Sequence, residues 1–203
     1  MRLTWLALAC CVLALICPSV LAWELPLLGV GKAVLTPQID GGLADGTWPQ
    51  ASGTPAFCDF RSGQLAEAQT RALVAWDDER LYVGFDCSEP RMDGLRATMG
   101  ERDGALWGDD CVEVFLRPPG DDTYYHFIVN PLGAVHDSQA QDGNWNCEVS
   151  AAAARGDSSW TCELSIPWEA VGGLPAMDSR WTANFCRCRR AAGFAARAAT
   201  GRL

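Results

Sequence analysis

The chain places a tryptophan in a Gly/Asp loop immediately before an alternating strand that carries one glutamate. Trp107 lies in the loop, and the strand predicted over 111–116 directs its valines to one face and Glu113 to the other. A flat indole can cover the C–H face of a pyranose, and a carboxylate accepts hydrogen bonds from its hydroxyl groups. The pair therefore predicts a carbohydrate site. The alternative is that Trp107 plugs one end of a β core and Glu113 is a solvated strand residue.

Asp109, Asp110 and Glu113 form a local run of carboxylates in the same segment. Glycoside hydrolysis needs two carboxyl groups that face each other across the scissile bond, and neighbours in a short run are not placed in that way. We therefore expect a binding module without catalytic residues, and no glycosidase activity from this chain alone.

The amino terminus has the pattern of a secretory signal peptide. Met1-Arg2 is positively charged, 3–16 is apolar but too short to span a bilayer, and Val20-Leu21-Ala22 offers a cleavage site before Trp23. The prediction is a signal peptide over 1–22 and one exported domain over 23–203, since no linker or repeat divides the remainder. The protein is expected to be secreted, either outside the cell or into the periplasm.

The formal net charge of −9 limits the partners of the exported domain. Nucleic acids and anionic membranes require a basic patch, so we expect no nucleic-acid partner and no membrane association after signal cleavage. A neutral carbohydrate, either a glycan end or an oligosaccharide, fits this charge.

Seven cysteines follow the predicted signal peptide, and an odd number cannot all pair. They are Cys58, Cys87, Cys111, Cys147, Cys162, Cys186 and Cys188. Export permits up to three disulfides with one free thiol, and buried thiols that pack as small apolar side chains are the alternative. Cys186 and Cys188 share a strand face, but no second Cys or His pair at zinc-finger spacing accompanies them, so no metal site is predicted.

Many short alternating segments separated by turn residues predict an all-β protein. The expected strands are 72–76, 81–87, 111–116, 124–130, 145–153, 160–166 and 181–185, with a short helix at most over 167–171. Strands without intervening amphipathic helices indicate an antiparallel β-sandwich of the jelly-roll or immunoglobulin-like kind. Trp48, Trp160 and Trp181 each belong to an apolar face and are expected in its core.

Four segments in this order resemble carbohydrate-binding module family 9 and its DOMON-like relatives over nearly all of 23–203. They are Ile39-Asp40-Gly41 with Asp45 and Trp48, Trp76-Asp77-Asp78 with Leu81-Tyr82-Val83, Trp107 with Asp110-Cys111-Val112-Glu113-Val114-Phe115, and Trp160 with Ile166-Pro167-Trp168. The resemblance implies a β-sandwich that clamps sugar between two Trp side chains. By position it makes Trp107 one wall of the clamp, Glu113 an acceptor for hydroxyl groups, and Asn130 a further polar contact.

The resemblance also implies structural calcium. Asp40 and Asp45, or Asp121 and Asp122, could supply oxygen ligands from loops, although neither loop has an EF-hand pattern. Asx turns are the simpler explanation for these aspartates.

The chain departs from the family pattern at two places. Ile128 stands where the family's sugar binder has an arginine, which removes one charge-assisted donor. After Phe185 the chain continues as an Ala/Arg-rich tail without the family's second clamp Trp or its closing strand. We therefore expect half of the clamp and an edge strand to be missing, as in a truncated or frame-shifted gene product.

Two other functions stay open at this point. DOMON-like relatives include b-type heme domains, and His126, His136, Met92 and Met99 are the obvious axial ligands here. Covalent heme is excluded because no Cys-x-x-Cys-His is present. The other alternative is an exported structural domain in which every Trp belongs to the core.

Overall fold

The computed structural model describes residues 26–191 and the backbone of 196–199. The predicted signal peptide, residues 1–22, lies outside the described residues. Within the described part, no helix is long and apolar enough to cross a membrane.

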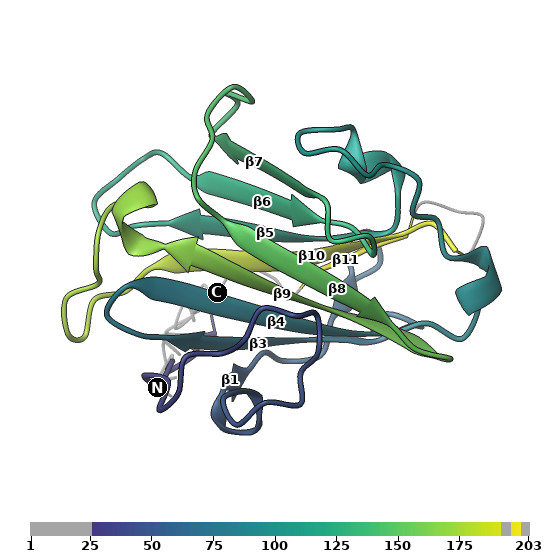
Figure 1. Ribbon diagram of the computed structural model, residues 1–203, viewed down its shortest axis with the longest axis horizontal. Coiled ribbons are helices and arrows are strands. Elements are labelled where there is room, and N and C mark those ends of the chain that lie inside the picture. The colour runs from purple at the N-terminus through teal and green to yellow at the C-terminus, as the bar shows by residue number, and fades with distance from the viewer. Residues whose placement is uncertain (1–25, 192–195, 200–203) are drawn as a thin grey trace, which may run out of the picture.

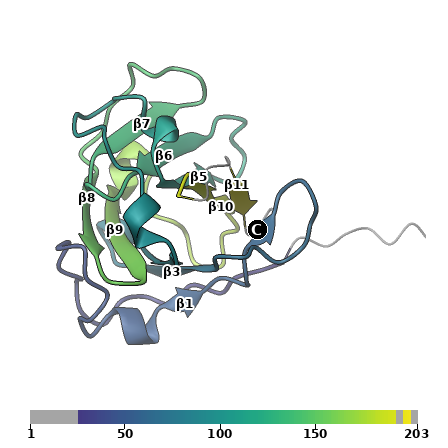
Figure 2. The ribbon, with the colours of Figure 1, turned by 90° about the vertical axis from the view of Figure 1, so that its right-hand side faces the viewer.

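Two antiparallel sheets pack face to face, which confirms the predicted all-β sandwich (Figures 1 and 2). One sheet has the order β1-β3-β4-β9-β8, formed by Ser52–Gly53, Thr70–Trp76, Arg80–Ser88, Ser159–Pro167 and Ser150–Arg155. The other has the order β2-β11-β10-β5-β6-β7, formed by Cys58–Asp59, Ala196–Ala199, Thr182–Arg189, Cys111–Arg117, Tyr125–Val129 and Val135–Gln139. The described helices are single 3-10 turns, η1 Trp48–Gln50, η2 Met92–Gly94, η3 Leu106–Gly108 and η4 Trp168–Ala170.

The core between the sheets consists of the alternating residues that the sequence predicted to face inward. β5 contributes Val112, Val114 and Leu116. The other predicted inward residues in this core are Leu81, Val83, Phe85, Cys87, Tyr125, Phe127, Val129, Trp160, Cys162, Leu164 and Ile166. Because successive strand residues point to opposite faces, this core leaves Cys111, Glu113 and Phe115 on the outer face of the six-stranded sheet.

The predicted hairpin over 72–87 is present as β3 and β4, with Trp76 opposite Leu81. Its acidic connection is held by Asp77, whose Oδ1 accepts hydrogen bonds from the backbone N–H groups of Glu79 at 2.9 Å and Arg80 at 2.8 Å. An Asp that accepts from the N–H groups two and three residues further along the chain is a common way to close such a turn.

The strand predicted over 145–153 begins later, at Ser150. Trp145 instead packs against Tyr125, with ring centroids 5.3 Å apart, and the Cys147 N–H donates to Asp137 at 2.8 Å. The alternation over 145–149 therefore reflects loop residues that are anchored to the neighbouring sheet. The prediction also missed β7, whose residues 135–139 are mostly polar.

The expected loss of the closing strand was wrong for the described tail. β10 runs to Arg189, and β11 pairs with it antiparallel from Cys186↔Ala199 to Arg189↔Ala196. Sheet hydrogen bonds join backbone groups, so an Ala/Arg segment supplies them without the family's side-chain motif. This pairing covers part of the edge that β10 would otherwise expose, and the other edge of β11 pairs with β2.

The three tryptophans predicted in the core differ in burial. Trp160 is fully buried, and Trp48 is 2% exposed, with its Nε1–H donating to Glu163 at 2.7 Å. Trp181 precedes β10 and is only half-buried, packed against Trp168 with ring centroids 5.5 Å apart. Its predicted place in the core was therefore correct only in part.

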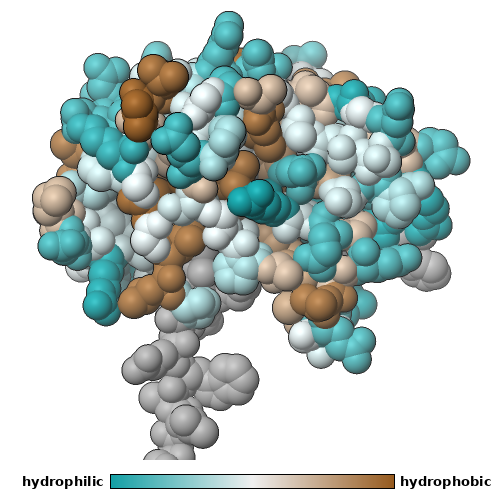
Figure 3. Space-filling view, turned by 90° about the horizontal axis from the view of Figure 1, so that it is seen from below, coloured by the Kyte–Doolittle hydropathy of each residue, from teal (hydrophilic) through white to brown (hydrophobic). Residues whose placement is uncertain are grey.

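The outer face of the five-stranded sheet is covered by the segment before β1. Trp48 forms a small cluster there with Leu73 and Tyr82, and Leu43 packs against it. Glu163 of β9 accepts hydrogen bonds from the Gly41 and Asp40 N–H groups at 2.6 and 2.9 Å. On the side of the molecule shown in Figure 3, apolar residues are scattered in small groups among hydrophilic ones.

A buried ion cluster joins the two sheets at one end of the sandwich. Glu89 follows β4 and is fully buried, and it accepts hydrogen bonds from Arg187 at 3.0 Å and from Arg189 at 2.7 and 2.8 Å. Burial raises the pKa of Glu89, but the hydrogen bonds from Arg189 and the Arg91 N–H, with the two guanidinium charges, lower it below its ordinary value.

Candidate functional site

The outer face of the six-stranded sheet carries the strand residues that alternate with the core. Strand pairing sets one row across it, His136 of β7, Ile128 of β6, Glu113 of β5 and Cys186 of β10. The next row consists of Ser138, His126, Phe115 and Asn184. Aromatic, carboxylate and amide groups thus share one sheet face, a combination that suits a polar ligand with apolar patches.

Trp107 lies in η3 beside this face. Its side chain is 48% exposed, and its ring meets His136 edge-on, with centroids 5.7 Å apart and planes at 86°. The turn is anchored by Leu106, which is fully buried in a cluster with Cys111 and Ile128. The indole is therefore presented to solvent from a fixed turn, as a stacking platform requires.

Two buried aspartates hold the loop that carries Trp107. Asp109 accepts hydrogen bonds from the N–H groups of Thr98 at 2.8 Å and Met99 at 2.9 Å. Burial raises the pKa of Asp109, but these bonds and those from the Thr98 hydroxyl and the Asn130 amide lower it below its ordinary value. Asp110 accepts from the N–H groups of Arg96 at 2.8 Å and Arg190 at 2.9 Å. Both carboxylates hold backbone in place and do not face each other across a ligand site.

Asn130, predicted as a sugar contact, is fully buried. Its Nδ2 donates to the Met99 carbonyl at 2.6 Å and to Asp109 at 3.0 Å, and its Oδ1 accepts from the Leu132 and Ala134 N–H groups, both at 3.1 Å. Both ends of the amide are thus hydrogen-bonded within the protein. The geometry suits a residue that positions the Trp107 loop.

Glu113 is 5% exposed and lies at the base of the face. Its Oε2 lies 2.9 Å from His126 Nε2, and its Oε1 accepts a hydrogen bond from Cys188 Sγ at 3.0 Å. His126 stacks on Phe115 with ring centroids 3.9 Å apart, so a partly buried aromatic pair lies beside the carboxylate.

Arg190 is a candidate that the sequence analysis missed. Its guanidinium donates through Nη2 to the Trp107 carbonyl, and its buried Nε has no hydrogen-bond partner within the described part of the chain. It brings a charged donor to the Trp107 loop, whereas Ile128, where the family has arginine, is buried and apolar. The three arginines in Arg187-Cys188-Arg189-Arg190 were the signal in the sequence that could have indicated a charged donor. Only the pairing of β10 with β5 shows that Arg190 reaches the Trp107 loop.

The residues considered for heme are divided between two faces. Met92 packs against the inner core, whereas His126 and His136 lie on the outer face of the six-stranded sheet. Met99 is fixed through its backbone, which bonds Asp109 and Asn130. Met92 therefore does not share a face with either histidine.

The loops considered for calcium use their carboxylates for turns. Asp40 accepts from the Gly42 N–H at 2.8 Å, Asp45 from the Thr47 N–H at 3.0 Å, and Asp121 from the Thr123 N–H at 2.8 Å. In the described residues, no three His, Cys, Asp or Glu side chains converge at these loops. This arrangement does not fit a calcium cage, in which several oxygen atoms meet.

Residues 39–195 match the model of a family described as carbohydrate family 9 binding domain-like. The chain belongs to this family. The match includes strands β1 to β10 of the family 9 domain and the Trp107 loop, and it ends directly before β11. No curated protein matches the chain.

Solved structures share the fold of this family 9 domain at low sequence identity. A putative carbohydrate-binding protein from Bacteroides uniformis is 19% identical, with a TM-score of 0.68 over 84% of this chain and 87% of the other. A carbohydrate-binding module family 9 from Caldicellulosiruptor kristjanssonii in complex with cellotriose is 16% identical, with a TM-score of 0.65 over 84% and 83%. The latter module in complex with glucose gives a TM-score of 0.60 over 84% of each chain, again at 16% identity.

Proposed function

We propose that this family 9 domain binds carbohydrate on the outer face of its six-stranded sheet, with Trp107 as the stacking wall. The observation that carries the proposal is the 48% exposed indole, held by a buried turn beside a face of aromatic and polar side chains. The family and the sugar-bound related modules support the same ligand class.

In this proposal the other predicted site residues have different roles. Glu113 and His126 act as one hydrogen-bonded acceptor and donor pair, which contacts sugar hydroxyl groups where the His126 side chain reaches solvent. Arg190 supplies a charged donor beside Trp107. Asn130 positions the loop through Asp109, so its contribution to binding is indirect.

The ligand class is a neutral sugar, either a glycan end or a short oligosaccharide. The formal net charge of −9 disfavours anionic glycans, whose approach it would oppose. We further propose that the domain is secreted and serves the breakdown of polysaccharide outside the cytoplasm. The signal-peptide pattern supports secretion.

A single stacking wall predicts weak binding. Stacking on one aromatic ring contributes on the order of 1 kcal/mol, which must offset several kcal/mol of lost ligand freedom. No Trp lies between Trp181 and Leu203, and the proposal therefore uses Trp107 as its single wall. We expect dissociation constants for small oligosaccharides near or above roughly a millimolar.

Replacement of Trp107 should abolish this binding without unfolding the protein. Trp107→Ala is expected to remove retardation in gels that contain soluble glucans or xylans, and to change the free energy of unfolding by less than about 1 kcal/mol, since half of the ring is already in water. Trp107→Phe keeps an apolar ring and should retain part of the retardation. Binding by Trp107→Ala at the wild-type level would refute the proposed site.

The carboxylates near the site should perform no hydrolysis. Asp109 and Asp110 are engaged by backbone N–H groups, so neither is presented to a ligand as a second carboxylate for Glu113. The protein is therefore expected to release no reducing sugar from xylan or cellulose. Turnover that Glu113→Gln abolishes would instead make Glu113 a catalytic residue.

A further inference from the structure

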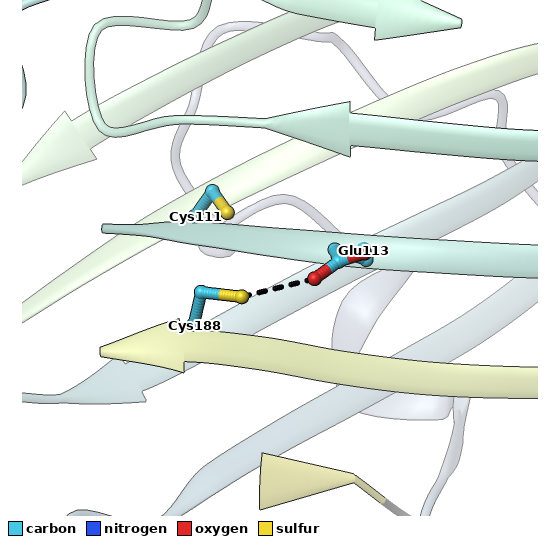
Figure 4. Close-up of side chains that lie close together, drawn as sticks. All are labelled: Cys111, Glu113 and Cys188. Carbon is cyan, nitrogen blue, oxygen red and sulfur yellow. Dashed lines mark hydrogen bonds between the residues drawn. The ribbon is translucent and has the colours of Figure 1, made fainter. Parts of the chain in front are cut away.

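Two cysteines and one glutamate converge on the outer face of the six-stranded sheet. Cys111 of β5 and Cys188 of β10 are paired across the two strands, and Glu113 lies two positions along β5 on the same face. Their sulfur and oxygen atoms all lie within 4.8 Å of one another. Figure 4 shows the three side chains directed toward one another from the two adjacent strands.

The three groups are buried and already interact. Cys111 is fully buried, Cys188 is 1% exposed and Glu113 is 5% exposed. Cys188 donates to Glu113 at 3.0 Å, and a hydrogen bond with Cys188, followed by burial, holds the pKa of the Cys111 thiol well above its usual value. In the described chain Cys111 and Cys188 are free thiols.

This set of donors selects a class of metal ion. Two thiolates and one carboxylate suit a borderline or soft divalent ion such as Zn²⁺, whereas Ca²⁺ and Mg²⁺ require oxygen ligands. Ligand atoms about 2.0–2.3 Å from a central zinc ion lie roughly 3.3–3.8 Å apart, so small side-chain rotations would close the group around one. We propose that Cys111, Glu113 and Cys188 form a binding site for Zn²⁺ or a similar divalent ion.

Binding would replace the thiol protons with the metal ion. Each thiol loses one proton to solvent, and the two thiolates and the carboxylate then carry three negative charges against two positive charges. Arg190, whose charge acts on Cys111, provides the remaining positive charge nearby. His126, 2.9 Å from the second Glu113 oxygen, would orient the carboxylate, as residues that hydrogen-bond to metal ligands commonly do.

The sequence spacing could not reveal this site. Cys186 and Cys188 are the only closely spaced cysteines after the signal peptide, but the structure pairs Cys188 with Cys111 instead of using a local Cys pair. The group supplies three protein ligands, the number that open zinc sites use. The proposed metal site shares Glu113 and His126 with the proposed carbohydrate face but does not use Trp107, so substitution of Trp107 distinguishes the two proposals.

Titration of the reduced, metal-free protein with Co²⁺ tests the proposal. We expect a thiolate-to-metal charge-transfer band that saturates at one equivalent, and its loss when Zn²⁺ displaces Co²⁺. Cys188→Ser and Cys111→Ser should lose the band, and Glu113→Gln should weaken Co²⁺ affinity at least about tenfold. Near-ultraviolet circular dichroism of the metal-free variants confirms that each is folded before its titration.

Two controls separate this site from other thiols and from the sugar site. Cys162→Ala removes a fully buried thiol from the inner core and should keep the full band. Trp107→Ala should also keep it, even though it removes sugar binding. The proposal is overturned if the wild type gives no band, if folded Cys188→Ser retains it, or if the isolated protein carries a Cys111–Cys188 disulfide.

Discussion

Glu89→Gln is expected to destabilise the protein by about 3–5 kcal/mol, since it leaves two buried arginines without their counter-charge. Arg187 is 1% exposed and Arg189 is 6% exposed, and both donate to the same buried carboxylate. The carboxylate comes from the segment after β4 and the arginines from β10, so the substitution weakens a connection between the two sheets. The midpoint of urea unfolding measures the loss.

Glu67→Gln provides a matched control. Glu67 lies 3.4 Å from Arg189 as well, but its side chain is 84% exposed, and exposed pairs contribute little. Its removal should cost less than about 1 kcal/mol. Equal effects of the two substitutions would show that the Glu89 cluster is not a buried ionic contact.

The Glu89 cluster should make the free energy of unfolding depend on pH in the acid range. The pKa of Glu89 is lower in the folded protein than its ordinary value of 4.5, so its contribution is present above that value and is lost as pH falls through the folded pKa. Wild type should therefore lose more stability in this range than Glu89→Gln. Unfolding midpoints measured across the acid range check this sign.

Trp160→Ala is expected to cost roughly 3–5 kcal/mol of the free energy of unfolding. The ring is fully buried in the core between the two sheets, and its strand β9 lies between β4 and β8. Removing it leaves a cavity that the surrounding strands can fill only partly. A denaturant midpoint near that of the wild type would contradict this burial.

Trp160→Phe tests whether the cost comes from lost packing. The Nε1–H of Trp160 has no hydrogen-bond partner within the described residues, so phenylalanine removes an unpaired polar group and keeps most of the ring. Its cost should be well below that of alanine. Trp181→Ala should also cost less than Trp160→Ala, because Trp181 is only half-buried.

The strand positions and their inward faces could be predicted because alternation is local. Val112 and Val114, or Trp160 and Cys162, show their shared face in the sequence alone. The strand in the carboxy-terminal tail could not be predicted in this way. β11 forms through backbone pairing with β10, and its Ala-rich sequence carries no strand signal. The polar strand β7 was missed for a similar reason.

The candidate site was only partly predictable. The exposed loop position of Trp107 follows from a Gly/Asp turn before a strand, and the structure agrees with it. The hydrogen-bond partners of Glu113 could not be predicted from the sequence, because Cys188 and His126 reach it from two other strands. Asn130 looked like a polar strand residue, and only the loop folded over it accounts for its burial.

The most direct test of carbohydrate binding follows the indole N–H signals of ¹⁵N-labelled protein by NMR during titration with cellotriose, the ligand of a related module. We predict that the Trp107 signal, assigned by its absence in Trp107→Ala, shifts progressively up to millimolar sugar. The signals of buried Trp48 and Trp160 should stay in place. Shifts confined to other tryptophans, or no shift at any sugar concentration, would contradict the proposed site.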